Sequence, residues 1–149
     1  MFMRFIDVLR FFETGKLPTK TEALFRNAEK GNAVAQANLG LCYSKGDGVH
    51  QDHKEAIRWF RLAARQGNSR AQFYLGCAHI AGEGVSKCCE RAYAYFEAAA
   101  VQGDQDAAEW RATIMKKMTP EQIFEGNRLA QEENPKPKER MSPARGRQK

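Results

Sequence analysis

The sequence predicts an all-α fold, a solenoid of about eight helices stacked in pairs. Three segments of the 149-residue chain align without gaps at a period of 36 residues, which Gly31, Gly67 and Gly103 mark. Within each segment apolar residues recur at helical spacing, and glycines separate the apolar runs. One short helix pair cannot bury its apolar face alone, so pairs repeated at this period are expected to stack on one another.

The first unit, residues 1–31, is degenerate. Its second helix is predicted over residues 21–30, because Leu24 and Ala28 stand where the later units carry a core aromatic residue and an alanine. Residues 2–13 are expected to form the partner helix. A short connection containing proline replaces the glycine loop of the later units.

Two full repeats follow, over residues 32–67 and 68–103. In the first, a helix from about residue 33 is expected to end at Gly46, because glycine readily adopts the positive φ that ends a helix. Asp52 is a favourable N-cap for the second helix. Small residues on the facing sides of the two helices predict a close approach. The second repeat matches the first at Ala35-Gln36 and Ala71-Gln72, at Leu39-Gly40 and Leu75-Gly76, and at Trp59-Phe60 and Tyr95-Phe96.

The last unit, residues 104–133, is expected to cap the solenoid. It begins as the others do, but Arg111 replaces the core leucine of the repeat. Thr119 and Gln122 then form a capping box around a first-turn proline, which is a strong start for a final helix. Residues 134–149 contain few apolar residues and are expected to be disordered.

The repeated pattern resembles the Sel1-like repeat, a relative of the tetratricopeptide repeat with a glycine-containing loop. The first helix and loop follow Ala-x-Ala-Gln-x-x-Leu-Gly-x-x-Tyr-x-x-Gly-x-Gly-Val, and the second helix follows Ala-x-x-Trp/Tyr-Phe-x-x-Ala-Ala-x-x-Gly. The match is close over residues 32–103 and extends over 20–133 with the end units, although His79 replaces Tyr43 of the first repeat. The resemblance implies a right-handed α/α superhelix that acts as a protein-binding adaptor.

The resemblance also implies a binding groove, because the first helix of each unit would line the concave surface. The candidate groove residues are Val34, Ala37, Leu41 and Lys45 in the first full repeat, Arg70, Phe73, Cys77 and Ile80 in the second, and Asp106, Glu109, Thr113 and Lys116 in the last unit. Leu41, Phe73 and Ile80 would anchor a protein or peptide, with Arg70 and Asp106 at the rim. The alternative is that neighbouring helices cover the apolar candidates, as they usually cover an apolar helical stripe.

No catalytic or cofactor-binding constellation is recognisable in the sequence, and we expect a protein that is not an enzyme and has no cofactor. The glycines of the loops lack the βαβ context of a nucleotide-binding fingerprint. His50, His53, Cys88 and Cys89 are residue types that bind zinc. They lie in separate loops, however, so ordinary loop residues are the favoured interpretation and no metal site is expected.

We expect a cytoplasmic protein that does not bind membranes. The apolar start of the chain is interrupted by Arg4, Asp7 and Arg10, which does not suit a signal peptide or a membrane span. The four cysteines show no CxxC spacing, and the adjacent pair is a poor candidate for a disulfide. A reducing compartment accounts for this cysteine usage.

The positive charge is concentrated at the end of the chain. The formal net charge is +6, of which residues 134–149 contribute +5, so no strongly charged face is expected on the body. The cations of this basic tail are Lys136, Lys138, Arg140, Arg145, Arg147 and Lys149. They support an alternative function, in which the tail binds nucleic acid or an acidic partner with an affinity that weakens as salt rises. A solvated tail without a ligand is the favoured interpretation.

Overall fold

Residues 20–133, the part of the chain that the computed structural model describes, form seven α-helices and no strand. The helices are α2 (Lys20–Glu29), α3 (Ala33–Lys45), α4 (His53–Arg65), α5 (Ser69–Ala81), α6 (Cys89–Val101), α7 (Gln105–Met115) and α8 (Pro120–Glu133). The all-α arrangement predicted from the sequence is confirmed. The expected helix over residues 2–13 and the basic tail lie outside the described residues.

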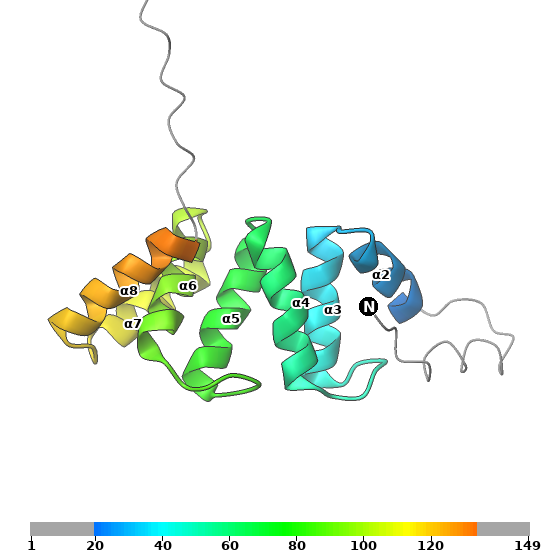
Figure 1. Cartoon of the computed structure of the whole chain (residues 1–149), viewed down its shortest axis with the longest axis horizontal. Helices are drawn as coiled ribbons and strands as arrows, with labels where there is room; N and C mark the ends of the chain where they lie inside the picture. Colours follow the sequence, from blue (N-terminus) through cyan, green and yellow to red (C-terminus); the bar gives the residue numbers. More distant parts are fainter. Residues whose placement is uncertain (1–19, 134–149) are drawn as a thin grey trace, which may run out of the picture.

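The helices stand side by side along one axis, roughly in sequence order (Figure 1). α3 packs against α4 and α5 against α6 within the two full repeats, while α2 packs on α3, α4 on α5 and α6 on α7. Most contacts therefore join helices that are neighbours in the sequence, as in a solenoid. α8 departs from this rule, since it packs against α6.

A short polar residue begins the first helix of three successive units. Asn32, Asn68 and Asp104 each accept, through Oδ1, a 2.9 Å hydrogen bond from the backbone N–H three residues later. This bond satisfies one of the amides that a helix start leaves without a helical partner. At the other end, Gly46 and Gly82 stop α3 and α5 in the left-handed conformation, with φ of 74° and 76°. The helix end predicted at Gly46 is confirmed.

The second helices of the two full repeats begin differently. Asp52 caps α4 by accepting hydrogen bonds from the backbone N–H groups of Lys54 and Glu55, at 3.0 and 3.1 Å. Cys88 takes nearly the same backbone conformation before α6, with φ −157° and ψ 107°, but its side chain makes no capping bond. The start of α6 is therefore less well satisfied than the start of α4.

In each full repeat, a buried phenylalanine ring of the second helix packs closely against a glycine of the first helix. A Cβ placed on Gly40 of α3 would lie 2.7 Å from the ring of Phe60, and a Cβ on Gly76 of α5 would lie 2.6 Å from the ring of Phe96. Any larger residue would push these buried rings away from the first helix. The close approach that small residues predict is confirmed.

The glycine loops contact the unit that precedes them. A Cβ on Gly84, between α5 and α6, would lie 2.5 Å from the backbone oxygen of His53, which begins α4. A Cβ on Gly48 would lie 2.4 Å from Oγ1 of Thr21 in α2. In both units the loop backbone thus lies directly on the first turn of the preceding second helix.

In each full repeat, a buried glutamine of the first helix pairs with a glutamine at the end of the second helix. Gln66 Nε2 donates to Gln36 Oε1 at 2.8 Å, and Gln102 Nε2 donates to Gln72 Oε1 at 2.7 Å. Gln36 also donates to the backbone oxygen of Ala28 at 3.1 Å, which joins α2 to the first full repeat. Polar groups buried in this way are stabilising only when they are paired, so the pairs specify how the helices align.

α8 is fixed to α6 by a close approach and by hydrogen bonds. A Cβ on Gly126 would lie 2.6 Å from the ring of Tyr93, whose hydroxyl donates to Asn127 Oδ1 at 3.1 Å. The predicted capping box is present: Thr119 N–H donates to Gln122 Oε1 at 3.0 Å, and Gln122 N–H donates to Thr119 Oγ1 at 3.2 Å. The start of the last helix is therefore confirmed, and its packing on α6 is new information.

Candidate functional site

The predicted groove residues lie on α3, α5 and α7, the first helices of three successive units. Ala37 is 2% exposed and belongs to the core cluster shared by α3, α4 and α5, so its side chain is not accessible to a partner. Leu41 is half-buried and packs against the same cluster. These two candidates join α3 to the next unit.

Phe73, Cys77 and Ile80 are half-buried and pack against the cluster that includes Phe96 and Ile114. They join α5 to α6 and α7. Burial raises the pKa of the Cys77 thiol to about 11, so this thiol is protonated at neutral pH. This packing agrees with the alternative that neighbouring helices cover the apolar candidates. Contact of their remaining exposed atoms with a partner stays a prediction.

The other groove candidates are exposed side chains of mixed character. They are Val34 and Lys45 on α3, Arg70 on α5, and Asp106, Glu109, Thr113 and Lys116 on α7. Val34 is 62% exposed, which is high for an apolar side chain. A partner-binding role for these residues also stays a prediction.

A row of three residues on the same helices was missed by the sequence argument. Asn38, Tyr74 and Trp110 occupy equivalent positions 36 residues apart, each directly after a residue chosen as a candidate. Tyr74 stacks on the core ring of Phe60 with centroids 5.2 Å apart, and Trp110 stacks on Phe96 with centroids 6.0 Å apart. Trp110 is nevertheless 43% exposed. The signal was in the sequence, since both aromatic residues recur at the repeat period.

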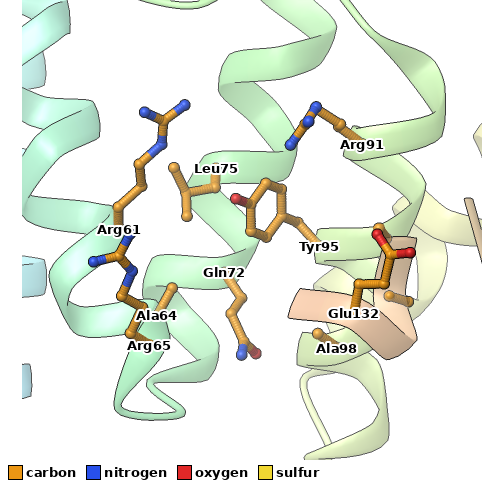
Figure 2. A pocket seen from close by; sticks show the side chains of 11 residues that line it. Arg61, Ala64, Arg65, Gln72, Leu75, Arg91, Tyr95, Ala98 and Glu132 are labelled. Atoms are coloured by element: carbon orange, nitrogen blue, oxygen red, sulfur yellow. The ribbon is translucent and has the colours of Figure 1, made fainter. Parts of the chain in front are cut away.

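A second feature is a pocket of about 520 Å³ between the second helices α4 and α6. Figure 2 shows Arg61 and Arg65 on one side, Arg91 on the other, and the ring of Tyr95 projecting between them. The pocket is lined by Arg61, Ala64 and Arg65 of α4, Gln72 and Leu75 of α5, Arg91, Ala94, Tyr95 and Ala98 of α6, and Ala130 and Glu132 of α8. α8 therefore completes the pocket as one wall.

The basic surface continues along α4 beyond this pocket. A neighbouring hollow is lined by Lys54, Arg58, Arg61 and Arg65, together with apolar atoms and Gly84 of the next loop. These cations are spaced three or four residues apart, so they share one face of the helix. The expectation of no charged face came from net charge alone, and the structure shows that a nearly neutral body carries a local basic stripe.

The residues considered for zinc do not converge. His53 Nδ1 lies 3.7 Å from Glu83 Oε2, while Cys88 and Cys89 both donate to Glu90 Oε2, at 3.3 and 3.4 Å. Within residues 20–133, no group of three or more histidine, cysteine, aspartate or glutamate side chains is arranged to hold a metal ion. Desolvation, and then Glu90, raise the pKa of the Cys89 thiol, which disfavours the thiolate that metals and electrophiles require.

Comparison with known proteins identifies the repeat. The family model described as the Sel1 repeat matches residues 33–68 and 69–104, the two units whose helices, loops and core are described above. The chain is a Sel1-like repeat protein. Sel1 repeat proteins are generally protein-interaction modules, and the family is typically non-catalytic.

Solved structures share the fold of this Sel1-like repeat protein. The crystal structure of a protective antigen present in uropathogenic Escherichia coli strains, which displays an SLR fold, is 34% identical over 85% of this chain, with a TM-score of 0.74. A Sel1 repeat protein from Oxalobacter formigenes is 38% identical over 61% of this chain, with a TM-score of 0.60. The present chain spans only 28% and 26% of the lengths of those two chains. No match was found among curated proteins.

Among the described helices of this Sel1-like repeat protein, none is both long and apolar enough to cross a membrane. The basic tail, which holds the other predicted contact residues, lies outside the described part of the chain.

Proposed function

We propose that this chain is a non-enzymatic, cytoplasmic adaptor that binds a protein or peptide on the face formed by α3, α5 and α7. The observation that carries this proposal is the position of Trp110, which is 43% exposed while its ring stacks on the buried ring of Phe96. A large aromatic side chain that is held rigidly at the surface loses little conformational entropy when a partner covers it.

The neighbouring side chains suit recognition of a mixed polar and apolar segment. Arg70 and Asp106 lie one helical turn before Tyr74 and Trp110, so a charge accompanies each aromatic ring. Val34 supplies an exposed apolar contact on α3. This arrangement combines an aromatic centre with charged flanks, the composition typical of energetically important contacts in interfaces.

Selection of binders from a random peptide display library, followed by titration of the selected peptides, tests the proposal. We expect Trp110→Ala to weaken binding of groove-directed peptides by about tenfold or more, because aromatic anchors at interface centres contribute about 2 kcal/mol or more. Phe124→Ala is the matched control, since Phe124 is 73% exposed but lies on α8, outside this face. The α3–α5–α7 assignment is wrong if the control weakens binding as much as Trp110→Ala, or if no selected peptide depends on Trp110.

In the alternative function, the cations of the basic tail bind nucleic acid or an acidic partner. A full-length variant with the six tail cations changed to glutamine separates the two proposals. Loss of binding in that variant, with no effect of Trp110→Ala, favours the tail.

A further inference from the structure

The pocket between α4 and α6 is lined by arginines and by apolar side chains. Arg61, Arg65 and Arg91 lie at its rim, and Glu132 is the one carboxylate among its lining residues. Glu132 is itself paired with Arg128 on α8. Arg61 and Arg65 are exposed and make no ion pair within the described part of the chain. The positive charge of Arg61 and Arg65 is therefore available to an acidic ligand.

Apolar side chains form part of the pocket lining. Ala64 and Ala98 are half-buried small residues on its two sides, the ring of Tyr95 projects between the helices, and Leu75 lies beneath. A guanidinium group binds a carboxylate through two parallel hydrogen bonds, which places an acidic side chain at the rim and leaves the interior to a neighbouring apolar side chain.

The arginines are not part of the repeat scaffold. The residues 36 positions later are Glu97 for Arg61 and Val101 for Arg65, whereas the core residue Phe60 returns as Phe96. Glu97 is paired with Arg111 instead of contributing to a basic rim. The second unit therefore folds without cations at these two positions, so Arg61 and Arg65 are not needed to form the repeat.

The charge of the chain beyond the structure points to the same kind of ligand. α8 ends at the wall of the pocket, and the sequence that follows it carries six cations and one glutamate. The same sign of charge disfavours the tail itself as the occupant.

We propose that this pocket binds an acidic peptide segment of a partner protein, in which carboxylates flank one apolar side chain. The pocket lies on α4, α6 and α8, so this inference goes beyond the face formed by α3, α5 and α7. Glu132 at the wall and the apolar side chains of the lining favour such a peptide over a nucleic-acid backbone, which presents a continuous row of phosphates.

Fluorescence anisotropy with the full chain tests the proposal. The probes are labelled ten-residue peptides of glutamate and aspartate with one central apolar residue, taken in turn as leucine, phenylalanine, tryptophan, isoleucine and valine. The reference probes are the same peptides with glutamine and asparagine in place of the acids, and a ten-nucleotide single-stranded DNA. We expect the acidic peptides to bind most tightly, and we expect their affinity to fall as the salt concentration rises.

Arg61→Gln with Arg65→Gln is expected to weaken binding of the acidic peptide by roughly tenfold or more, because two charge-assisted contacts are lost. Arg26→Gln with Lys30→Gln is the matched control, since it removes the same charge from two exposed side chains, four residues apart, at the end of α2 and outside this pocket. The control is expected to change binding by less than about twofold, as is usual for distant sites.

Three kinds of outcome would overturn the proposal for this pocket. The first is that none of the acidic peptides binds the wild-type chain. The second is that the control weakens binding as much as the pocket variant, or that neutralising the tail abolishes binding while the pocket variant has no effect. The third is tighter binding of the DNA with the same dependence on Arg61 and Arg65, which would assign the pocket to nucleic acid.

Discussion

At the scale of single residues, Gly76 determines how closely the two helices of the second repeat approach. Glycine inside a helix usually costs about 1 kcal/mol relative to alanine. Here a Cβ would lie within 2.6–2.9 Å of three atoms of the Phe96 ring, which is itself fully buried. We expect Gly76→Ala to lower the free energy of unfolding by about 1–3 kcal/mol, because overpacking outweighs the gain in helix propensity. Urea unfolding measures the difference.

The same clash supplies the control for this prediction. In the double variant with Phe96→Leu, the ring atoms that the new methyl group meets are gone, so Gly76→Ala should cost much less than it does in the wild-type background. Equal costs in both backgrounds would show that the ring is not what excludes a side chain at this position.

Cys77 illustrates how packing controls chemistry at one residue. Because burial raises its pKa to about 11, the reactive thiolate is scarce at pH 8 and becomes the main form only above about pH 11. We expect alkylation of Cys77 by iodoacetamide in the folded chain to accelerate about tenfold per pH unit over this range. Mass spectrometry of the alkylated peptide follows the rate. A plateau reached near pH 9 in the folded chain would contradict the assigned burial.

At the scale of elements, the second helices of the two full repeats, α4 and α6, begin with different N-cap residues. Asp52 caps α4 through its side chain, and Cys88 occupies the same position before α6 without a capping bond. We expect Cys88→Ser to raise the free energy of unfolding by about 0.5–1 kcal/mol, since serine is a favoured N-cap with an oxygen acceptor. Serine is chosen over aspartate because Glu90 lies 3.3 Å from Cys88 Sγ and would repel a second carboxylate.

Asp52→Ala is the counterpart in the first repeat and is expected to cost about 1 kcal/mol. Thermal unfolding of both variants beside the wild type compares the two caps. No gain from Cys88→Ser, together with the expected loss from Asp52→Ala, would show that the thiol contacts of Cys88 already compensate for the missing cap.

Most elements were predictable because their signals are local. The end of α3 at Gly46, the cap at Asp52 and the box of Thr119 with Gln122 depend on residues within one helical turn, and all three are present. The packing of α8 on α6 was not predictable, because it depends on Gly126 meeting Tyr93 across 33 residues. Nothing in either segment alone indicates that contact.

At the scale of the whole molecule, contacts between successive helices make stability a local property. Leu39 is fully buried in a cluster that joins α2, α3 and α4. We expect Leu39→Ala to cost about 2–5 kcal/mol and to lower amide hydrogen-exchange protection in these helices, while α7 and α8 keep theirs because they share no core cluster with Leu39.

Leu75→Ala is the comparison, because Leu75 is the equivalent residue of the second full repeat and is also fully buried. Leu75→Ala should reduce amide hydrogen-exchange protection in the helices before α5 and in those after it. A uniform loss over all seven described helices in the Leu39→Ala variant would instead indicate that the solenoid unfolds as one cooperative unit.

The candidate surfaces were only partly predictable, for two physical reasons. On α5, the concave-face argument chose Phe73 and missed Tyr74, because one residue rotates the side chain by about 100° around the helix. Both side chains are half-buried, and each packs against a different core cluster, which only the packing shows. The basic pocket was missed because it joins Arg61 and Arg65 to Arg91, which stands on another helix, and to the end of α8. The face on which a side chain lies follows from the helical period of the sequence. The helix that this face contacts does not follow from that period.

The contact of Gly48 and Gly84 with the preceding unit bears on how this chain can change in evolution. Surface loops ordinarily accept insertions and deletions more readily than helices do. Here each loop tip lies against a neighbouring helix, so an added residue would displace this close contact instead of enlarging an open bend. Length changes in this lineage should therefore accumulate as whole 36-residue units, and the gene would grow or shrink by duplication and loss of modules while each module keeps a constant size.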